Sequence, residues 1–500
     1  MARAVLALDQ GTTGTTALVI STTGEVLGRA YRELTQHYPR PGWVEQDADE
    51  IWRDSLGALN AALEDSGLPA DRIAALGITN QRETTVVWDR ATGQPVHRAV
   101  VWQSRQSAPL CEALREDGVE PVLRRKTGLV ADAYFSGTKI RWILDRYPGL
   151  RPRAERGEIL FGTVDTWLLW KLTGGAVHRT DPTNACRTLL FDIHRMAWDD
   201  ELCGILQVPP AMLPEVSASS SEVFGHTTGD GPLPPGLPIA GIAGDQQAAL
   251  FGQGCWRPGQ AKNTYGTGCF LLMNMGDESP ISNGGLLTTV GCDAHGRPTY
   301  CLEGSVFTAG AAVQWLRDGL GIIAEAADTE ALARQLDGNG GVYLVPAFSG
   351  LGAPYWDMDA RGTLVGLTAG SGRAHLARAV LEAIAYQSRD VLEVMDADSG
   401  VPITELRVDG GACANDFLMQ FQADVTGVPV DRPSMIESTS LGAAMLAGLA
   451  VGLWRDPEEL AGARRPGRRF VPAMNGDARD ALYAGWRRAV GRTVDPVRGR

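Results

Sequence analysis

The amino-acid sequence predicts an α/β protein of two similar domains with a nucleotide between them, and three observations support this prediction. The chain has 500 residues, more than the about 250 to 300 that a single hydrophobic core usually serves. Short apolar runs typical of strands alternate along it with helical patterns. A polar stretch, a Gly-Thr turn and a long apolar run occur in that order at 9–20 and again at 262–274, which favours an internal repeat over chance recurrence of turn residues.

Several segments of the chain predict individual elements and a domain boundary. Strands are expected at 73–79, 85–88 and 239–242, and a helix at 165–171. Residues 226–238 are dense in Gly and Pro and predict an irregular loop, with the domain junction slightly beyond it. We therefore expect domains at 1–253 and 254–500. The uncharged stretch 441–454 falls short of the roughly 20 residues of a membrane span and predicts a buried helix.

Charge and cysteine content narrow the class of protein. With 46 Lys and Arg against 59 Asp and Glu, the net charge of −13 argues against nucleic acid or an anionic membrane surface as the main partner. The eight cysteines include no Cys-x-x-Cys pair, and Cys186, Cys203, Cys269 and Cys301 lie in apolar runs, as expected of reduced core residues. The N-terminal apolar run is broken by Asp9 and is too short for a secretion signal. These features predict a cytoplasmic protein.

The segment at 4–20 reads as strand, turn and strand, and it is a candidate phosphate site. Gly11 and Gly14 lack the Cβ atoms that would keep phosphate oxygens away from the N–H groups of the turn. Asp9, at the end of the first apolar run, is placed to orient a hydrated Mg2+. An ordinary hairpin with a polar turn would show the same local pattern.

Another glycine turn lies at 407–416, where a short strand ending in Asp409 meets Gly410 and Gly411 and opens a helix. Free N–H groups at a helix start favour an anion, and glycine lets a ribose or a base lie against the backbone. A tight strand-to-helix turn without a ligand is the competing interpretation.

Asp245 is the candidate for chemistry. It follows a small apolar strand and precedes a helix, so its carboxylate is expected at the carboxyl end of a strand, where open α/β sheets bind ligands. An alcohol that attacks a γ-phosphoryl group needs a nearby proton acceptor, and Asp245 is the best candidate for that role. Its alternative role is that of a helix N-cap.

Arg82 and Glu83 stand side by side between two predicted strands. One interpretation is a solvated turn with a surface ion pair, which would contribute about 0 to 1 kcal/mol. The other is a set of donors and acceptors that binds several hydroxyls of a polyol. Trp102 and Tyr134 would then supply a wall for its carbon atoms and one further hydroxyl contact, although both residue types are core residues by default.

In combination, the motifs of this chain resemble those of the glycerol kinases, members of the FGGY family of carbohydrate kinases, whose ATPase fold is shared with actin and Hsp70. The resemblance runs from Val5 to about Trp454. QRETT beside YFSGTK distinguishes the glycerol kinases from relatives that act on xylulose or other sugars. The motifs are LDQGTT at 8, TNQRETT at 79, YFSGTK at 134, GTVDTWLLWKLTG at 162, IAGDQQAALFGQ at 242, KNTYGTGCF at 262, VPAFSGLGAPYWD at 345 and VDGGACAN at 408.

The resemblance implies a fold, a reaction and a set of site residues. Two duplicated actin-like (ribonuclease H-like) domains would enclose a cleft in which ATP and glycerol react to sn-glycerol 3-phosphate and ADP. Asp9 and Asp245 would flank Mg2+, and Asp245 would be catalytic. The nucleotide would contact Thr12, Thr13, Gly14, Thr16, Thr267, Gly310, Gln314, Gly411 and Asn415. Glycerol would contact Thr12, Arg82, Glu83, Trp102, Tyr134, Asp245, Gln246 and Phe270.

Departures from the family pattern concern the first turn and regulation. Many bacterial relatives have Ser-Ser-Arg after DQGTT, whereas this chain has Gly14, Thr15 and Thr16. Thr16 cannot supply the missing cation, and Lys262 is one residue that could compensate. The loop 226–238 has no Lys or Arg, and His226 lies too early to match a phosphorylated histidine. We therefore expect neither regulation by fructose 1,6-bisphosphate nor phosphorylation by the phosphotransferase system.

Two other functions compete with glycerol phosphorylation. A kinase of the same fold could act on another small polyol or a ketose, but Arg82, Glu83 and Tyr134 argue against it. An actin-like ATP-driven switch is a further alternative, which the QRETT and GDQQ motifs disfavour. The resemblance also implies a homodimer or homotetramer.

Overall fold

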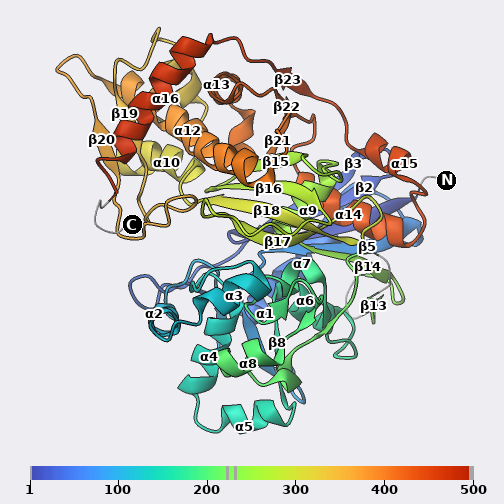
Figure 1. Cartoon of the computed structure of the whole chain (residues 1–500). Coiled ribbons are helices and arrows are strands. Elements are labelled where there is room, and N and C mark those ends of the chain that lie inside the picture. The colour runs from blue at the N-terminus through green and yellow to red at the C-terminus, as the bar shows by residue number, and fades with distance from the viewer. Residues whose placement is uncertain (1–2, 221–223, 230–232, 495–500) are drawn as a thin grey trace.

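The computed structural model describes residues 3–220, 224–229 and 233–494, and it contains two large mixed β-sheets with helices on their faces (Figure 1). The first sheet has the strand order β13 (Gly225–His226), β14 (Pro238–Gly244), β5 (Ile73–Asn80), β1 (Ala4–Gln10), β2 (Gly14–Ser21) and β3 (Val26–Glu33). The second has the order β17 (Leu287–Cys292), β18 (Pro298–Val306), β16 (Cys269–Gly276), β15 (Ala261–Tyr265), β21 (Leu406–Asp409), β22 (Val430–Arg432) and β23 (Arg468–Phe470).

The two sheets repeat one topology. β1 pairs antiparallel with β2 and parallel with β5, and β2 continues antiparallel to β3. β15 pairs in the same way with β16 and β21, and β16 continues antiparallel to β18. Parallel strands β14 and β22 then extend the two sheets beyond β5 and β21. This common order confirms the repeat predicted from the two Gly-Thr segments.

Both faces of the first sheet are buried, which explains why β1 is apolar throughout. Leu6 and Leu8 pack in one core with helices α1 (Ala48–Ser66) and α6 (Val164–Leu172), whereas Val5 and Ala7 pack in another with α14 (Ser438–Ala450). Successive side chains of a strand point to opposite faces, so both sets must be apolar. Helix α14 therefore covers the first sheet although it comes late in the sequence.

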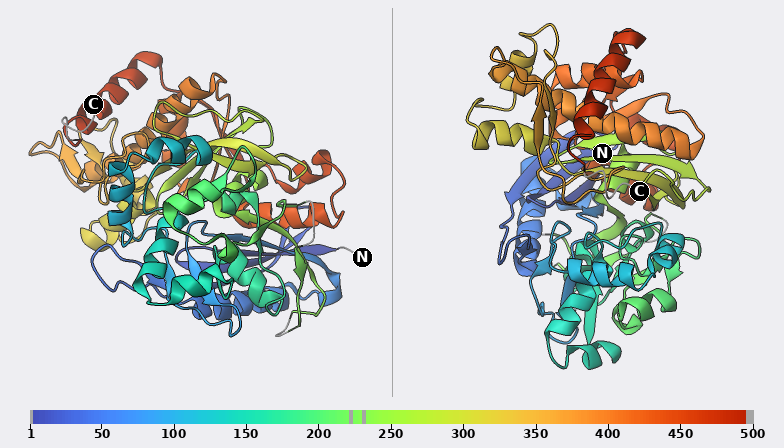
Figure 2. Two further views of the ribbon diagram at one scale, coloured as in Figure 1. Left: turned by 60° about the horizontal axis from the view of Figure 1, so that its bottom comes forward. Right: turned by 60° about the vertical axis from the view of Figure 1, so that its left-hand side comes forward.

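The second sheet packs against α12 (Arg373–Ser399), in one core with α13 (Asp416–Thr426) and α16 (Gly476–Val490). Between the two sheets, α9 (Asp245–Gly252) lies against α14 and also contacts β15, β16 and β17. The right-hand view of Figure 2 shows a group of blue-green and green helices at the opposite end of the molecule from α12 and α16. They include α2 (Ala108–Glu116), α3 (Glu120–Thr127), α4 (Ser136–Arg146), α5 (Leu150–Glu155) and α8 (Asp200–Leu206). The short helix α7 (Pro182–Ala185) lies nearer the centre, against β14 and β17.

Small two-stranded sheets and short helices complete the described chain. The strand pairs are β4 (Glu45–Gln46) with β7 (Ala99–Val100), β6 (Val86–Asp89) with β8 (Ile159–Gly162), β9 (Arg179–Thr180) with β12 (Glu215–Val216), β10 (Phe191–Asp192) with β11 (Ala197–Trp198), and β19 (Tyr343–Val345) with β20 (Thr363–Val365). The short helices are α10 (Gly310–Gln314), α11 (Asp328–Ala333) and α15 (Pro457–Ala463).

The elements predicted from sequence are present as β5, β6, α6 and β14, and the predicted buried helix is α14. All eight cysteines are free and buried. One expectation needs correction, because the double glycine after β21 does not open a helix directly. A 3-10 turn, Gly411–Ala414, intervenes, and α13 then begins with Asn415 as its N-cap. Within the predicted loop 226–238, residues 230–232 lie outside the described residues.

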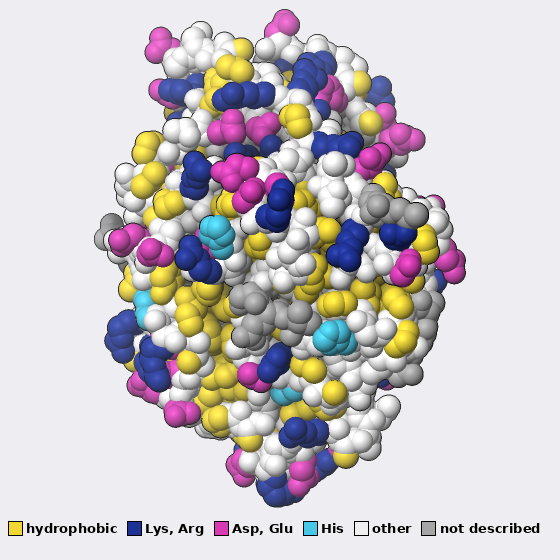
Figure 3. All heavy atoms as spheres, turned by 90° about the vertical axis from the view of Figure 1, so that its right-hand side faces the viewer, with side chains coloured by type: hydrophobic (Ala, Val, Ile, Leu, Met, Phe, Trp, Pro, Cys, Tyr) yellow, Lys and Arg dark blue, Asp and Glu magenta, His cyan; other side chains and the backbone are white. Residues whose placement is uncertain are grey.

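Two surface observations bear on the predicted partners. On the face shown in Figure 3, Lys and Arg side chains are interspersed with Asp and Glu and form no continuous basic surface. None of the helices in the described ranges is long and apolar enough to span a membrane.

Candidate active site

The β1–β2 turn is held in place by side chains that bind its carbonyl groups. Gly11 N–H donates to the carbonyl of Gly14 at 2.9 Å, and the carbonyl of Thr12 accepts from Gln36 and Gln46 at 2.7 and 2.8 Å. A Cβ on Gly14 would collide with the ring of Tyr31, so the turn requires glycine there. Thr16 lies within β2, paired with Asp9 of β1.

The two carboxylates predicted to flank a metal ion lie near each other. Asp9 belongs to β1, and Asp245 opens α9 directly after β14. Burial, and then the negative charge of Asp245, raises the pKa of Asp9 to about 8. Among the described residues, Asp9 has no Lys or Arg partner, and no group of three or more His, Cys, Asp or Glu could hold a metal ion. Two carboxylates suit Mg2+ only if substrate phosphates and water complete its coordination.

Asp245 is not an N-cap. The cap of α9 is Gly244, and the Asp245 side chain accepts instead from the N–H of Gln246 at 2.7 Å and lies 3.2 Å from Nε of Arg82. The side chain remains 29% exposed. Burial raises the pKa of Asp245, although Arg82 opposes the rise. The carboxylate is therefore fixed in direction and still accessible to a ligand.

Arg82 and Glu83 are not a solvated turn, because both side chains are only 2% exposed. Arg82 donates from Nη1 and Nη2 to Glu303 at 2.6 and 3.0 Å, and from Nη2 to the hydroxyl of Tyr134 at 3.2 Å. Arg187 donates to Glu83 at 2.7 Å and to Glu303 at 3.0 Å. Of the two interpretations, the surface ion pair is therefore wrong, because Arg82 and Glu83 belong to a buried network.

Three aromatic rings form a wall beside this network. Trp102 lies edge-on to Tyr134 and to Phe270, with ring centroids 5.6 and 6.1 Å away. The indole N–H of Trp102 donates to the hydroxyl of Thr12 at 2.8 Å. The wall therefore connects the predicted acceptor site to the β1–β2 turn.

Two buried lysines donate hydrogen bonds to residues of the site. Lys139 donates to the backbone carbonyls of Glu83 and Tyr134 and so ties their two loops together. Lys262 donates to Gln246 at 2.5 Å, to Thr264 at 2.7 Å and to the carbonyl of Phe270 at 3.2 Å. All three N–H groups of Lys262 therefore have partners. This argues against Lys262 taking the place of the arginine that many relatives have at the position of Thr16.

A cavity of about 700 Å3 lies on the side of the second sheet. All five residues predicted for the nucleotide in the second half line it, namely Thr267, Gly310, Gln314, Gly411 and Asn415. The cavity is also lined by residues of α11, which the sequence analysis did not single out, including Thr329 and Glu330. Asn415 donates to the Thr329 hydroxyl at 3.2 Å.

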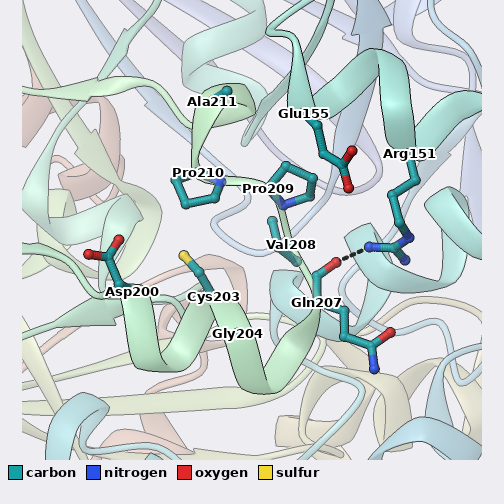
Figure 4. Close-up of a pocket in the computed structure, with 10 residues that line it drawn as sticks. All are labelled: Arg151, Glu155, Asp200, Cys203, Gly204, Gln207, Val208, Pro209, Pro210 and Ala211. Carbon is teal, nitrogen blue, oxygen red and sulfur yellow. Dashed lines mark hydrogen bonds between the residues drawn. The ribbon is translucent and has the colours of Figure 1, made fainter.

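Figure 4 shows another cavity, of about 520 Å3, between α5 and α8. None of the predicted site residues lines it. Arg151 points toward Gln207 and donates to its backbone carbonyl. Burial raises the pKa of the Cys203 thiol to about 12, so this thiol is not a nucleophile at neutral pH.

Sequence reasoning missed four residues of the site: Arg187, Glu303, Lys139, and Gln247, whose Oε1 accepts from Nη1 of Arg82 at 3.4 Å. Glu303 follows no glycine turn and lies inside an alternating strand, where a charged residue reads as solvent-facing. Arg187 follows α7 in a polar stretch. For Lys139 the YFSGTK motif itself was the available signal.

Comparison with known proteins agrees with this geometry. Residues 4–252 match the N-terminal domain, and residues 261–451 the C-terminal domain, of the FGGY family of carbohydrate kinases. The chain is 58% identical over 490 residues to Glycerol kinase 2 of Thermotoga maritima, across 98% of each chain. It is 59% identical to the glycerol kinase of Dechloromonas aromatica, across 98% of this chain and 97% of that one.

Among solved structures, the Plasmodium falciparum glycerol kinase with ADP superposes with a TM-score of 0.90 at 34% identity, across 99% of each chain. Sequence and fold thus agree over nearly the whole length. The chain belongs to the FGGY family of carbohydrate kinases.

Proposed function

We propose that this protein is a glycerol kinase, which transfers the γ-phosphoryl group of ATP to glycerol and forms sn-glycerol 3-phosphate and ADP. The observation that carries the proposal is the set of buried Arg82, Glu83 and Tyr134 together with the partly exposed Asp245, beside the Trp102 wall. The high identity to glycerol kinases over nearly the full length supports the same substrate.

A small triol is strongly hydrated, so a protein selects it by replacing its water hydrogen bonds with a convergent set of its own. Within the described residues, nothing hydrogen-bonds Oε2 of Glu83, which leaves that oxygen to accept from a hydroxyl. Arg82 and Gln246 would bind the other hydroxyls, and Trp102 and Phe270 would pack against the carbon atoms. Thr12 would lie where the acceptor meets the phosphate turn.

Asp245 acts as the general base in this proposal. The acceptor hydroxyl gives its proton to the Asp245 carboxylate while its oxygen bonds to the γ-phosphorus, and the bond from that phosphorus to the ADP oxygen breaks. The raised pKa of Asp245 makes it a better proton acceptor than an exposed aspartate. Arg82 Nε, 3.2 Å away, keeps the carboxylate in one direction.

The nucleotide would bind between the β1–β2 turn and the large cavity. Thr12, Thr13, Gly14 and Thr16 would face its phosphates, and the five residues lining the 700 Å3 cavity would hold the nucleoside. Asp9 and Asp245 would hold Mg2+, which neutralises phosphate charge when bound. The Asp9 carboxylate, which has no Lys or Arg partner among the described residues and lies near Asp245, fits such a cation.

The remaining parts of the proposal concern organisation. We infer domains at 1–253 and 254–500 that enclose both substrates and exclude water, which would otherwise accept the phosphoryl group. Eight free, buried cysteines are compatible with a reducing cytoplasm. A homodimer or homotetramer is proposed by analogy with the family.

The deciding experiment measures ADP release with and without glycerol. The proposal predicts turnover that requires glycerol and prefers it in a panel of small polyols and ketoses. Turnover without any acceptor would instead support an ATP-driven switch, and preference for a ketose would support a related sugar kinase. Absence of turnover under all conditions would contradict each of the kinase assignments.

A further inference from the structure

Glu303 is a buried carboxylate for which the proposed reaction provides no role. It lies in β18 of the second sheet and is fully buried. Its two oxygens bind the two terminal nitrogens of Arg82, at 2.6 and 3.0 Å. Such a two-point pairing fixes both the position and the plane of a guanidinium.

The direction of Arg82 matters because its other contacts belong to the acceptor site. With its plane set by Glu303, Nε of Arg82 lies 3.2 Å from Asp245 and Nη2 lies 3.2 Å from the hydroxyl of Tyr134. A rotation of the guanidinium would therefore move donors away from two acceptor-site residues together.

Arg187 extends the same constraint to Glu83. It is fully buried and donates from Nη2 to Glu303 at 3.0 Å and from Nε to Oε1 of Glu83 at 2.7 Å. Its guanidinium also lies over the rings of Tyr134 and Phe135, at 5.5 and 5.3 Å. With Oε1 anchored, the other oxygen of Glu83 has a defined direction for a ligand hydroxyl.

Glu303 carries the charge that pairs directly with both arginines of this network. Burial alone would raise the pKa of Glu303, but Arg187 and Arg82 lower it to about 2. Two arginines thus face two glutamates. Without the Glu303 charge, the arginines would have to draw on Glu83 and Asp245, the carboxylates that the acceptor needs.

The network also crosses between the two halves of the molecule. Arg82 follows β5 of the first sheet and Arg187 follows α7, whereas Glu303 comes from the second sheet. The first half alone therefore lacks the group that orients its own arginine.

We propose that Glu303 is a positioning residue of the acceptor site, which orients Arg82 directly and Glu83 through Arg187, and so makes glycerol recognition depend on contact between the two halves. This inference rests on the proposed glycerol kinase activity. Glu303 itself does not touch the acceptor in this assignment.

The test compares steady-state kinetics of Glu303→Gln with those of the unaltered protein. Loss of the charge should reduce kcat/KM for glycerol about 100-fold, mainly through KM, while KM for ATP changes less than about threefold. Selectivity for glycerol over propane-1,2-diol, which lacks one hydroxyl, should also fall. A merely structural role would lower activity toward both acceptors equally.

Two further variants control this test. Glu382→Gln makes the same change in another buried pair, in which Arg378 donates to Glu382 at 2.7 Å within α12. It should reduce stability without changing KM for glycerol or the selectivity. Glu303→Asp keeps the charge but is too short to reach both arginines, so it should recover part of the lost kcat/KM. If Glu303→Gln does not fold, an intermediate KM in Glu303→Asp decides the question.

The outcomes separate the two proposals. If the unaltered protein does not phosphorylate glycerol, the proposed function fails, whatever Glu303 does. If it does, but a folded Glu303→Gln or Glu303→Asp keeps the original KM and selectivity, the positioning role is wrong. Equal losses for Glu303→Gln and Glu382→Gln would also overturn it.

Discussion

The acceptor site and the large cavity on the second sheet differ in how they are built. In the acceptor site five ionisable side chains, Arg82, Glu83, Arg187, Asp245 and Glu303, lie within ion-pair distance of a neighbour. The cavity of about 700 Å3 is lined mainly by small and apolar residues, with a few charges. The hydrogen bond from Trp102 to Thr12 joins the acceptor site to the β1–β2 turn, which contributes no residue to the lining of the cavity.

This difference corresponds to the chemistry of the two proposed ligands. A triol offers little apolar surface, so its recognition depends on polar groups that are already in place and already desolvated. A nucleoside offers a large planar surface, which an apolar cavity can bind without a fixed set of charges. Changes in the first region should therefore alter acceptor use, and changes in the second should alter nucleotide affinity.

The largest expected effect comes from Asp245→Asn. The amide keeps the shape of the side chain but cannot accept the hydroxyl proton, so kcat should fall about 100-fold or more. ADP affinity, measured by calorimetry, should change little. A normal kcat would remove Asp245 from the mechanism.

An intermediate effect is expected from Tyr134→Phe. Loss of the hydroxyl leaves an N–H of Arg82 without its partner at 3.2 Å and removes a polar group next to the acceptor. KM for glycerol should rise about 10-fold with KM for ATP unchanged. Equal changes in both constants would mean that the two regions are not separable.

Gly411→Ala is expected to have the opposite effect, weakening nucleotide binding while leaving glycerol binding unchanged. An added Cβ at Gly411 meets no atom within 4 Å, so the free protein should keep its stability, but the methyl group would occupy cavity space. ADP should bind about threefold to fivefold more weakly, with KM for glycerol unchanged. Gly338→Ala is the matched control, because a Cβ there also meets nothing and Gly338 does not line the cavity. ADP affinity that stays the same in Gly411→Ala would exclude this glycine from the nucleotide site.

The smallest effect concerns stability alone and should leave both regions unchanged. Burial lowers the pKa of His178 to about 4, and its Nε2–H donates to the backbone carbonyl of Phe161 at 2.8 Å, which a neutral imidazole can do. Because the unfolded chain binds this proton more readily, the free energy of unfolding should fall as pH falls from about 6.5 toward 4, by about 2 kcal/mol between pH 7 and pH 5.

His178→Gln should reduce that dependence in denaturant titrations at pH 7 and pH 5. The exposed His295 provides the control substitution, His295→Gln, which should keep the original dependence. An identical pH dependence in all three proteins would show that other groups cause it.

Which parts of the site could be predicted from the sequence depends on how far apart the interacting groups lie in the sequence. The β1–β2 turn, the strand end before Asp245 and the turn after β21 are local, so glycine spacing and apolar runs indicate them directly. The contact of Arg82 with Glu303 spans 221 residues, and that of Arg187 with Glu83 spans 104. Neither contact leaves a local pattern in the sequence. Sequence reasoning therefore identified Arg82 and Glu83 as candidate polyol-binding residues but not their partners Glu303 and Arg187.

The position of α14 was equally hidden from local patterns. Its apolar composition predicts burial but not the surface that it covers, and α14 packs on the first sheet although it follows β22 of the second. The family motifs supplied what periodicity could not, since they imply a known chain path and a set of expected site residues.

Helix α14 packs closely against α9 and the first sheet at the centre of the molecule. Gly442 of α14 faces the backbone of Ala248 and Gly252 in α9, the helix that begins at Asp245, and a Cβ at Gly442 would collide with it. Gly77 and Gly241 in the first sheet lie equally close to the backbone of α14, so a Cβ at either position would also collide with it. Two helices and two strands thus meet backbone to backbone, and a single added methyl group there would change the spacing between the halves and, through α9, the depth at which the Asp245 carboxylate lies.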